Sequence, residues 1–153
     1  MKFVIQRVKK ASVEINSETI SQIGKGYLVL VGITDSDTKE IADKMIQKLI
    51  GLRIFEDENG KTNLSIKDVD GDLLIVSQFT LYADCKKGNR PSFIKAGNPA
   101  FAKDLYQYIL EKTANLYEKP VYSGEFGADM KISLENIGPF TIILDSTEII
   151  ASA

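Results

Sequence analysis

The chain has no histidine and no tryptophan, and its 153 residues include a single cysteine, Cys85. Without an imidazole, neither a Ser-His-Asp triad nor a Cys-His pair can be built, and zinc sites made of His and Cys lack their ligands. The carboxylates are scattered rather than grouped at the spacing of metal ligands. We therefore expect no metal, no other cofactor and no disulfide within the chain.

Long apolar runs are also missing. No stretch approaches the roughly 18 residues that span a bilayer. The N-terminus alternates apolar and charged positions from Lys2 to Lys9, unlike the apolar core of a signal peptide. A lone cysteine agrees with a reducing compartment. With 44% hydrophobic residues, the length suits one globular domain, and we expect a cytoplasmic protein without membrane contact.

Excess positive charge is absent too. The formal net charge is −2, so the field of the whole molecule does not attract nucleic acid. A local basic cluster is nevertheless present, because four basic residues fall within ten positions: Lys86, Lys87, Arg90 and Lys95. Two interpretations are open: the cluster is either an ordinary solvated loop or the point at which a polyanion binds.

The pattern of the first half predicts strands followed by a helix. Alternating apolar and polar residues indicate strands at 3–8 and 11–16, which we expect to pair as a hairpin, and a more deeply buried strand follows at 27–33. Asp37 with Glu40 resembles a capping box. Apolar residues at helical spacing behind it predict an amphipathic helix.

The second half contains a buried strand that ends in polar residues. Residues 73–76 are continuously apolar, and the polar stretch 77–80 follows at once. Residues 82–97 hold too many Lys, Gly, Asn and Pro residues to continue a sheet, so we expect a long loop there. Asn98 is a good helix cap with Pro99 at the first helical position, and a second amphipathic helix follows.

Two last strands, about 130–136 and 140–146, are predicted to be joined by a tight turn at 137–139. The order of strands and helices predicts an α+β fold. We expect a largely antiparallel, barrel-like sheet with two amphipathic helices packed against it.

Three segments combine polar side chains with unusual backbone requirements: 77–80, 86–95 and 136–141. Each has an ordinary explanation. The polar groups of 77–80 can bond the neighbouring backbone at a sheet edge. Gly138-Pro139 can be a simple turn, since only about 5–6% of X-Pro bonds in folded proteins are cis.

Taken together, these segments resemble the signatures of the D-aminoacyl-tRNA deacylases in order and spacing. The matching motifs are Gln6-Arg7-Val8 with Ala11-Ser12-Val13, Ser77 to Asp84, Gly88 to Phe93, Phe126 to Met130 and Asn136 to Thr141. Ile137 and Phe140 stand where Asp and a small β-branched residue are usual. We expect a deacylase domain at 1–146 and a C-terminal tail at 147–153 with no assigned role.

The resemblance implies a homodimeric enzyme that hydrolyses the ester between a D-amino acid and the 3′ end of tRNA. It also implies hydrolysis of glycine wrongly attached to tRNA-Ala. In the family, the peptide bond between Gly138 and Pro139 is cis, and each subunit inserts this element into the active site of the other. Two carbonyls would then accept hydrogen bonds from the α-ammonium group. A D side chain would find open space, whereas an L side chain would meet backbone.

At the strand end, we expect the backbone N–H groups around Phe79 and Thr80 to stabilise the oxyanion. Ser77 and Gln78 would orient the terminal ribose or adenine. The nucleophile has two interpretations: the Thr80 hydroxyl, which has no visible general base, or a water molecule assisted by the 2′-hydroxyl of the terminal adenosine. The absence of histidine favours assistance by the substrate.

We expect Phe126 and Met130 to line the adenosine pocket, with apolar contact from Phe79. Arg7 either braces the Gly138-Pro139 element through a carbonyl or forms a surface pair with a carboxylate. In this context the basic residues become contacts to tRNA phosphates: Lys86, Lys87, Arg90 and Lys95.

Two other functions stay open. A non-catalytic nucleic-acid-binding protein can use the same basic loop. A related deacylase clears tRNA wrongly charged with L-alanine, but that relative carries a different tetrapeptide at the position of Ser77 to Thr80.

Overall fold

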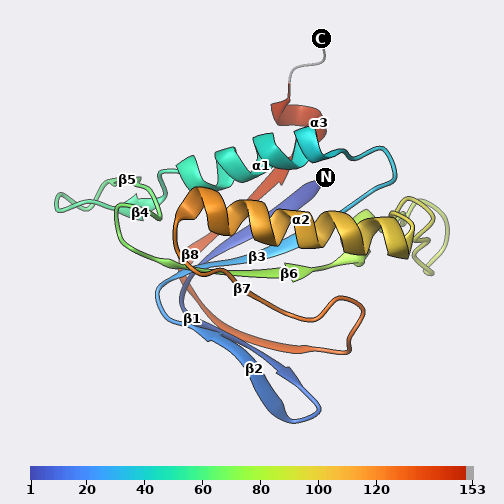
Figure 1. Ribbon diagram of the computed structural model, residues 1–153, viewed down its shortest axis with the longest axis horizontal. Coiled ribbons are helices and arrows are strands. Elements are labelled where there is room, and N and C mark those ends of the chain that lie inside the picture. Colours follow the sequence, from blue (N-terminus) through green and yellow to red (C-terminus); the bar gives the residue numbers. More distant parts are fainter. Residues whose placement is uncertain (151–153) are drawn as a thin grey trace.

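The computed structural model describes residues 1–150, in which two helices lie side by side on one face of a curved six-stranded sheet (Figure 1). The helices are α1 (Lys39–Gly51) and α2 (Pro99–Tyr117). The strands of the sheet are β1 (Lys2–Ile15), β2 (Glu18–Ile23), β3 (Gly26–Gly32), β6 (Asp72–Ser77), β7 (Tyr122–Ser123) and β8 (Lys131–Asp145). The smaller elements are the hairpin strands β4 (Phe55–Glu56) and β5 (Thr62–Leu64), the 3-10 helix η1 (Phe79–Tyr82) and α3 (Ser146–Ile149).

β1 organises the sheet. Its first half pairs with β3 and its second half with β2, while β8 runs antiparallel along almost its whole length. The predicted hairpin between 3–8 and 11–16 is therefore wrong, because both ranges belong to this one strand. The turn lies instead at Asn16 and Ser17, whose φ angles of 50° and 66° suit the centre of a type I′ hairpin turn.

Two strand pairings are parallel, β3 with β6 and β6 with β7. Parallel neighbours need crossover connections, and α1 and α2 lie in these two connections. The antiparallel pairings of the main sheet all involve β1. The prediction of an α+β fold with a barrel-like sheet and two packed helices is confirmed, with the two parallel pairings in addition.

Both faces of the sheet are buried. One hydrophobic cluster joins Phe3 and Ile75 of the sheet with Met45 of α1 and Ile109 of α2. A second cluster contains the residues Val8, Ala11, Val13, Ile23, Leu28, Leu74 and Val76. Burial on both sides explains why β6 is apolar at every position from 73 to 76.

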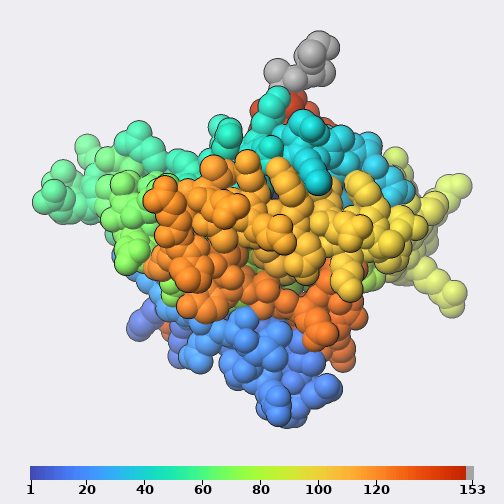
Figure 2. Space-filling model, in the orientation of Figure 1, coloured from blue at the N-terminus to red at the C-terminus, as the bar shows by residue number. Residues whose placement is uncertain are grey.

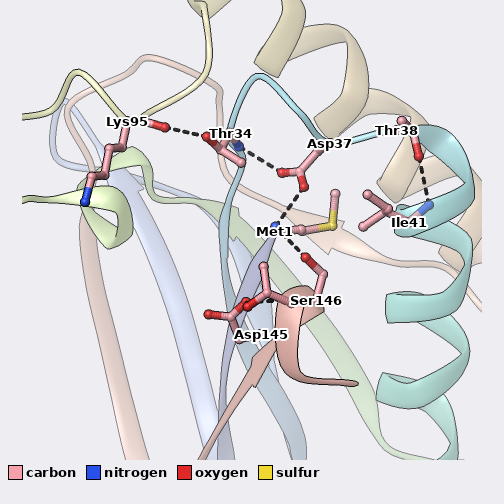
Figure 3. A network of polar contacts seen from close by, with 9 residues as sticks. Met1, Thr34, Asp37, Thr38, Ile41, Lys95, Asp145 and Ser146 are labelled. Atoms are coloured by element: carbon pink, nitrogen blue, oxygen red, sulfur yellow. Dashed lines mark hydrogen bonds and ion pairs between the residues drawn. The ribbon is translucent and has the colours of Figure 1, made fainter. Parts of the chain in front are cut away.

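The N-terminal amine lies in the interior and connects distant elements. Met1 N donates to Asp37 Oδ1 at 2.8 Å and to Ser146 Oγ at 2.9 Å, and all three residues are buried (Figure 3). The predicted capping role of Asp37 is therefore wrong, because its carboxylate binds this amine. Thr38 caps α1 instead, and its hydroxyl accepts a backbone N–H of the first turn at 3.2 Å.

β8 is one strand, so the prediction of two strands joined by a tight turn is wrong. The register with β1 jumps along the way, since Val8 pairs with Asn136 but Gln6 pairs with Thr141. Residues 137–140 therefore stand opposite Arg7 alone, which gives β8 three extra residues that bulge out of the ladder. This segment, Ile137 to Phe140, is called the Gly-Pro bulge below.

The first residues of the predicted C-terminal tail belong to a short helix. Ser146–Ile149 form α3, and the Asp145 carboxylate caps this helix by accepting the Thr147 N–H at 3.0 Å. Residues 151–153 of the predicted tail lie outside the described residues.

Within residues 1–150, no helix is both long enough and apolar enough to cross a membrane.

Candidate active site

The end of β6 carries polar groups out of the core. Residues 73–76 are fully buried, and the chain becomes partly exposed at Ser77. The Gln78 N–H donates to the Val31 carbonyl at 2.8 Å, which extends the pairing with β3 by one residue. At Phe79 the chain turns into η1. The sheet therefore fixes the backbone of this strand end and leaves its side chains at least partly exposed.

A cavity of about 780 Å³ opens beside this strand end. Four stretches that are distant in sequence form its wall. They contribute Ile33 and Asp35, then Ser77 to Phe79, then Phe93, Ile94, Ala96 to Pro99 and Ala102, and finally Phe126 to Met130 with Ile132. Small-molecule sites typically enclose about 300–1,000 Å³, so the cavity is large enough for the end of a nucleotide.

Hydrogen bonds from two backbone N–H groups hold one side of the cavity. The Gly97 N–H donates to the Ile33 carbonyl at 2.8 Å, and the Asn98 N–H donates to Asp35 Oδ1 at 2.8 Å. The segment before α2 is thereby tied to the end of β3. Asn98 Oδ1 caps α2 by accepting two N–H groups of the first turn, and Pro99 occupies the first helical position, which confirms the predicted cap.

Phe126 and Met130 are positioned by residues behind them. The Tyr106 ring lies 6.0 Å from the Phe126 ring, and its hydroxyl donates to the Ile75 carbonyl at 2.6 Å. Burial raises the pKa of Tyr106 to about 12, so the phenol stays a donor at neutral pH. Gly124 makes room for Met130, because a Cβ at position 124 would lie 2.5 Å from its sulfur.

The mouth of the cavity is apolar. The rings of Phe79 and Phe93 pack edge to face with their centroids 5.2 Å apart, yet the two residues are 56% and 38% exposed. Ile94, which also lines the cavity, is 84% exposed. Large apolar side chains left open around a concave site are typical of a surface that a ligand or a partner covers.

Thr80 lies beside the cavity and not on its wall. Its hydroxyl oxygen accepts a hydrogen bond from Gln78 Nε2 at 2.5 Å. In η1 the Leu81 N–H donates to the Gln78 carbonyl, whereas the N–H groups of Phe79 and Thr80 have no backbone partner within residues 1–150. These two groups are therefore available as donors to a ligand.

The loop at 84–92 carries three of the four residues of the basic cluster, Lys86, Lys87 and Arg90, and projects from the molecule (yellow-green in Figures 1 and 2). Two backbone hydrogen bonds between Asp84 and Ser92, at 2.7 and 2.8 Å, close its base. The Lys86 N–H donates to the Asp84 carboxylate and lowers its pKa, and Lys95 forms an ion pair with the same group at 3.4 Å. Within residues 1–150, the exposed basic side chains of this loop that form no ion pair are Lys86, Lys87 and Arg90.

The Gly138–Pro139 peptide bond is cis, and both residues are exposed. Arg7 is buried under the Gly-Pro bulge and contacts carbonyls rather than a carboxylate. Its Nε and Nη2 donate to the Ile137 carbonyl at 3.2 and 3.1 Å, and its Nη1 donates to the Ile54 carbonyl at 2.7 Å. With Ile137, Arg7 lines a second, separate cavity of about 440 Å³.

The structure thus brings some of the predicted residues together and leaves others apart. The predicted residues on the wall of the large cavity are Ser77, Gln78, Phe79, Phe126 and Met130. The predicted residues that do not line this cavity are Thr80, Gly138, Pro139, Arg7 and the four basic residues. Two carboxylates on the wall, Asp35 and Asp129, are absent from the predicted set. Asp129 stands inside the motif Phe126 to Met130, so a signal for it was present.

Comparisons with known proteins agree on one family. A family model described as D-Tyr-tRNA(Tyr) deacylase matches residues 4–145. A curated D-aminoacyl-tRNA deacylase of Thermosipho melanesiensis is 50% identical, over 97% of this chain and 99% of that protein. Another, of Flavobacterium psychrophilum, is 55% identical, over 95% of this chain and 97% of that protein.

Solved structures share the fold. A structure named c-Myc DNA Unwinding Element Binding Protein matches with a TM-score of 0.90 at 42% identity, over 95% of this chain and 98% of that one. A structure described as a probable eukaryotic D-amino acid tRNA deacylase matches with a TM-score of 0.83 at 18% identity, over 94% and 97%, which shows the fold alone.

The family model and the relatives place this protein in the class of hydrolases that act on ester bonds. More narrowly, the chain belongs to the D-Tyr-tRNA(Tyr) deacylase family. The resemblance noted in the sequence is confirmed.

Proposed function

We propose that this chain hydrolyses the ester of D-aminoacyl-tRNA, as its relatives' names state for them, and that the reaction takes place in the cavity beside Ser77–Phe79. One observation carries the proposal: the β6 end, the segment before α2 and Phe126–Met130 converge on one cavity wall. The products are a free D-amino acid and tRNA. We place the reaction in the cytoplasm, where charged tRNA is used.

The terminal adenosine fits the apolar part of the cavity. Stacking of a base on an aromatic side chain contributes about 1–3 kcal/mol, and Phe79 and Phe126 present their rings on the wall with Met130. Ser77 and Gln78 offer a hydroxyl and an amide to the ribose or the base edge. The tRNA phosphates then meet the basic residues Lys86, Lys87, Arg90 and Lys95.

We propose a homodimer in which each Gly-Pro bulge completes the cavity of the other subunit. Within residues 1–150, β8 pairs with β1 alone, so its second edge is open. Leu134, Ile137 and Ile143 of this strand are 37%, 38% and 66% exposed. An open strand edge with exposed apolar side chains beside it favours association with a second copy, and a two-fold axis then creates two identical sites.

In that arrangement the partner's Gly138 and Pro139 stand beside the scissile ester. Their backbone accepts hydrogen bonds from the α-ammonium group and blocks the direction that an L side chain takes. Glycine has no side chain to reject, so we also propose cleavage of glycine wrongly attached to tRNA-Ala. Rejection by backbone collision reads chirality without recognising a particular side chain.

The chemistry uses backbone donors and the substrate itself. The free N–H groups of Phe79 and Thr80 stabilise the tetrahedral oxyanion, and loss of one such donor typically costs about 10²–10³ in rate. The Thr80 hydroxyl is bonded to the Gln78 amide nitrogen, which is a donor and not a general base. We therefore assign activation of the attacking water to the 2′-hydroxyl of the terminal adenosine.

The test compares the esters of D-tyrosyl-tRNA, L-tyrosyl-tRNA and L-alanyl-tRNA with purified protein and without it. We expect rapid loss of the D-ester and a much slower loss of both L-esters, which is measurable above the rate without protein only at high protein concentration. Equal and negligible decay of all three would overturn the proposal. Preferential loss of the L-alanyl ester would assign the chain to the related deacylase instead.

A second candidate is nucleic-acid binding without catalysis. The exposed basic loop favours it, and so does the similarity to the 42% identical structure, whose name is that of a DNA-binding protein. The same assay separates the two functions, because a protein that only binds tRNA leaves the ester bond intact.

A further inference from the structure

The side chain of Asn136 closes the base of the Gly-Pro bulge. Its Nδ2 donates to the Arg7 carbonyl at 3.0 Å and to the Phe140 carbonyl at 2.9 Å, and its Oδ1 accepts the Phe140 N–H at 3.2 Å. One amide therefore uses both of its donor hydrogens and its acceptor. It connects the two ends of the bulge to each other and to the facing strand β1.

These bonds replace strand pairing that the bulge interrupts. The ladder between β1 and β8 passes from Val8–Asn136 to Gln6–Thr141, so Arg7 has no paired residue on this side. The Asn136 amide supplies the Arg7 carbonyl with the donor that a regular strand would provide. The backbone at the base is thus fixed although the register jumps by several residues.

The residues above this base have few other restraints. Gly138 and Pro139 are exposed, and Gly138 has a φ of +124°, a conformation that side-chain-bearing residues rarely adopt. Within residues 1–150, the side-chain bonds to the bulge come from Arg7 and Asn136. Arg7 holds the Ile137 carbonyl at one end of the bulge, whereas Asn136 holds both the N–H and the carbonyl of Phe140 at the other.

We propose that Asn136 is a positioning residue for chiral selection: it sets the height and angle at which Gly138 and Pro139 stand over the ester in the neighbouring subunit. This inference rests on the proposed function, in which that backbone rejects L side chains. An error of about 1 Å in such a position can cost about 10² in rate. The Asn136 amide does not touch the substrate and acts through the backbone that it holds.

The experiment measures kcat/KM for D-tyrosyl-tRNA and L-tyrosyl-tRNA with wild type, Asn136→Ala and Asn136→Asp. Asn136→Asp keeps the shape and an acceptor but places a carboxylate against the Arg7 and Phe140 carbonyls, which lose their donors. We expect both variants to lower the ratio of the D rate to the L rate by about 10-fold or more, with most of the D-ester loss in kcat. Ser133→Ala, an exposed position on the same strand, should keep the wild-type ratio.

The ratio separates positioning from simple destabilisation. If Asn136 only stabilised the fold, the remaining folded protein would keep the wild-type D to L ratio, and the rates would fall in proportion to the unfolded fraction measured by circular dichroism. An unchanged ratio in both variants would overturn the inference. A wild-type protein that cleaves neither ester would overturn the proposed function, which is a different result. If Asn136→Ala does not fold, Asn136→Asp decides the matter by the same ratio.

Discussion

Arg7 holds Ile137 with two nitrogens: Nε and Nη2 both donate to its carbonyl, at 3.2 and 3.1 Å, while the guanidinium lies 4.6 Å from the centroid of the Phe140 ring. Lysine has a single nitrogen and cannot reproduce this planar fork. We expect Arg7→Lys to lower the free energy of unfolding by about 1–3 kcal/mol and to reduce cleavage of the D-ester.

Urea denaturation and the deacylation assay check this prediction. Lys9→Met is the matched control, because Lys9 is exposed on the same strand and should change stability by less than about 0.5 kcal/mol. Wild-type stability and activity in Arg7→Lys would show that the fork is dispensable.

The hydroxyl of Thr80 is expected to be dispensable for the chemistry. It accepts a hydrogen bond from the Gln78 amide, which cannot take up its proton. We expect Thr80→Ala to keep kcat within about 10-fold of wild type. A substrate that ends in 2′-deoxyadenosine should react about 10²-fold or more slowly, as expected when a proton-transfer group is lost. An inactive Thr80→Ala with normal turnover of the deoxy substrate would make Thr80 the nucleophile.

The basic loop is expected to set the salt dependence of tRNA binding. Replacing Lys86, Lys87 and Arg90 together with alanine removes three cations that form no ion pair within residues 1–150. The plot of log K against log salt should become shallower by about 0.7–0.9 for each phosphate that is no longer neutralised. The control replaces three exposed lysines outside the loop: Lys44, Lys48 and Lys67. Equal slopes in the two triple variants would show that the loop does not contact the tRNA phosphates.

The buried amine of Met1 is expected to stabilise the whole fold through Asp37. The pair is fully enclosed, with side-chain exposures of 0% and 2%, so removal of the carboxylate leaves an uncompensated charge. We expect Asp37→Ala to cost about 3–5 kcal/mol in urea unfolding. Asp104→Ala, exposed on α2, should cost less than about 0.5 kcal/mol. Similar losses in both variants would contradict this role.

The sequence correctly predicted those elements that depend on residues close to one another in the chain. The cap at Asn98 and Pro99 and the buried strand 73–76 were found because side-chain chemistry and burial on two faces determine them directly. Asp37 also stands where a capping residue is expected, but its carboxylate binds the buried N-terminal amine of Met1. Tertiary contacts of this kind leave no local trace.

The hairpin prediction failed at Lys9 and Lys10. These two charged residues interrupt the alternation of apolar and polar positions, but in the fold they are exposed positions within β1, where its register with β8 shifts. The sequence motifs correctly predicted two parts of the cavity wall, the strand end at Ser77–Phe79 and the segment Phe126–Met130. Asp35 was missed because its place on the wall follows from a contact with Asn98, which is distant in sequence.

The most direct test of the account is complementation between two damaged subunits. Gly138→Ala damages the bulge, because its Cβ would lie 2.9 Å from Arg7 Nη2 at a φ of +124°. Phe79→Pro damages the cavity side by removing an N–H and a ring at the first position of η1, where proline is tolerated. Each variant alone should be nearly inactive on D-tyrosyl-tRNA.

If the bulge of one subunit serves the cavity of the other, a mixed dimer has one site with both parts intact. Co-refolding equal amounts should then restore about a quarter of wild-type activity, since half of the dimers are mixed and each has one working site of two. A mixture that stays as inactive as its two components would contradict the shared site.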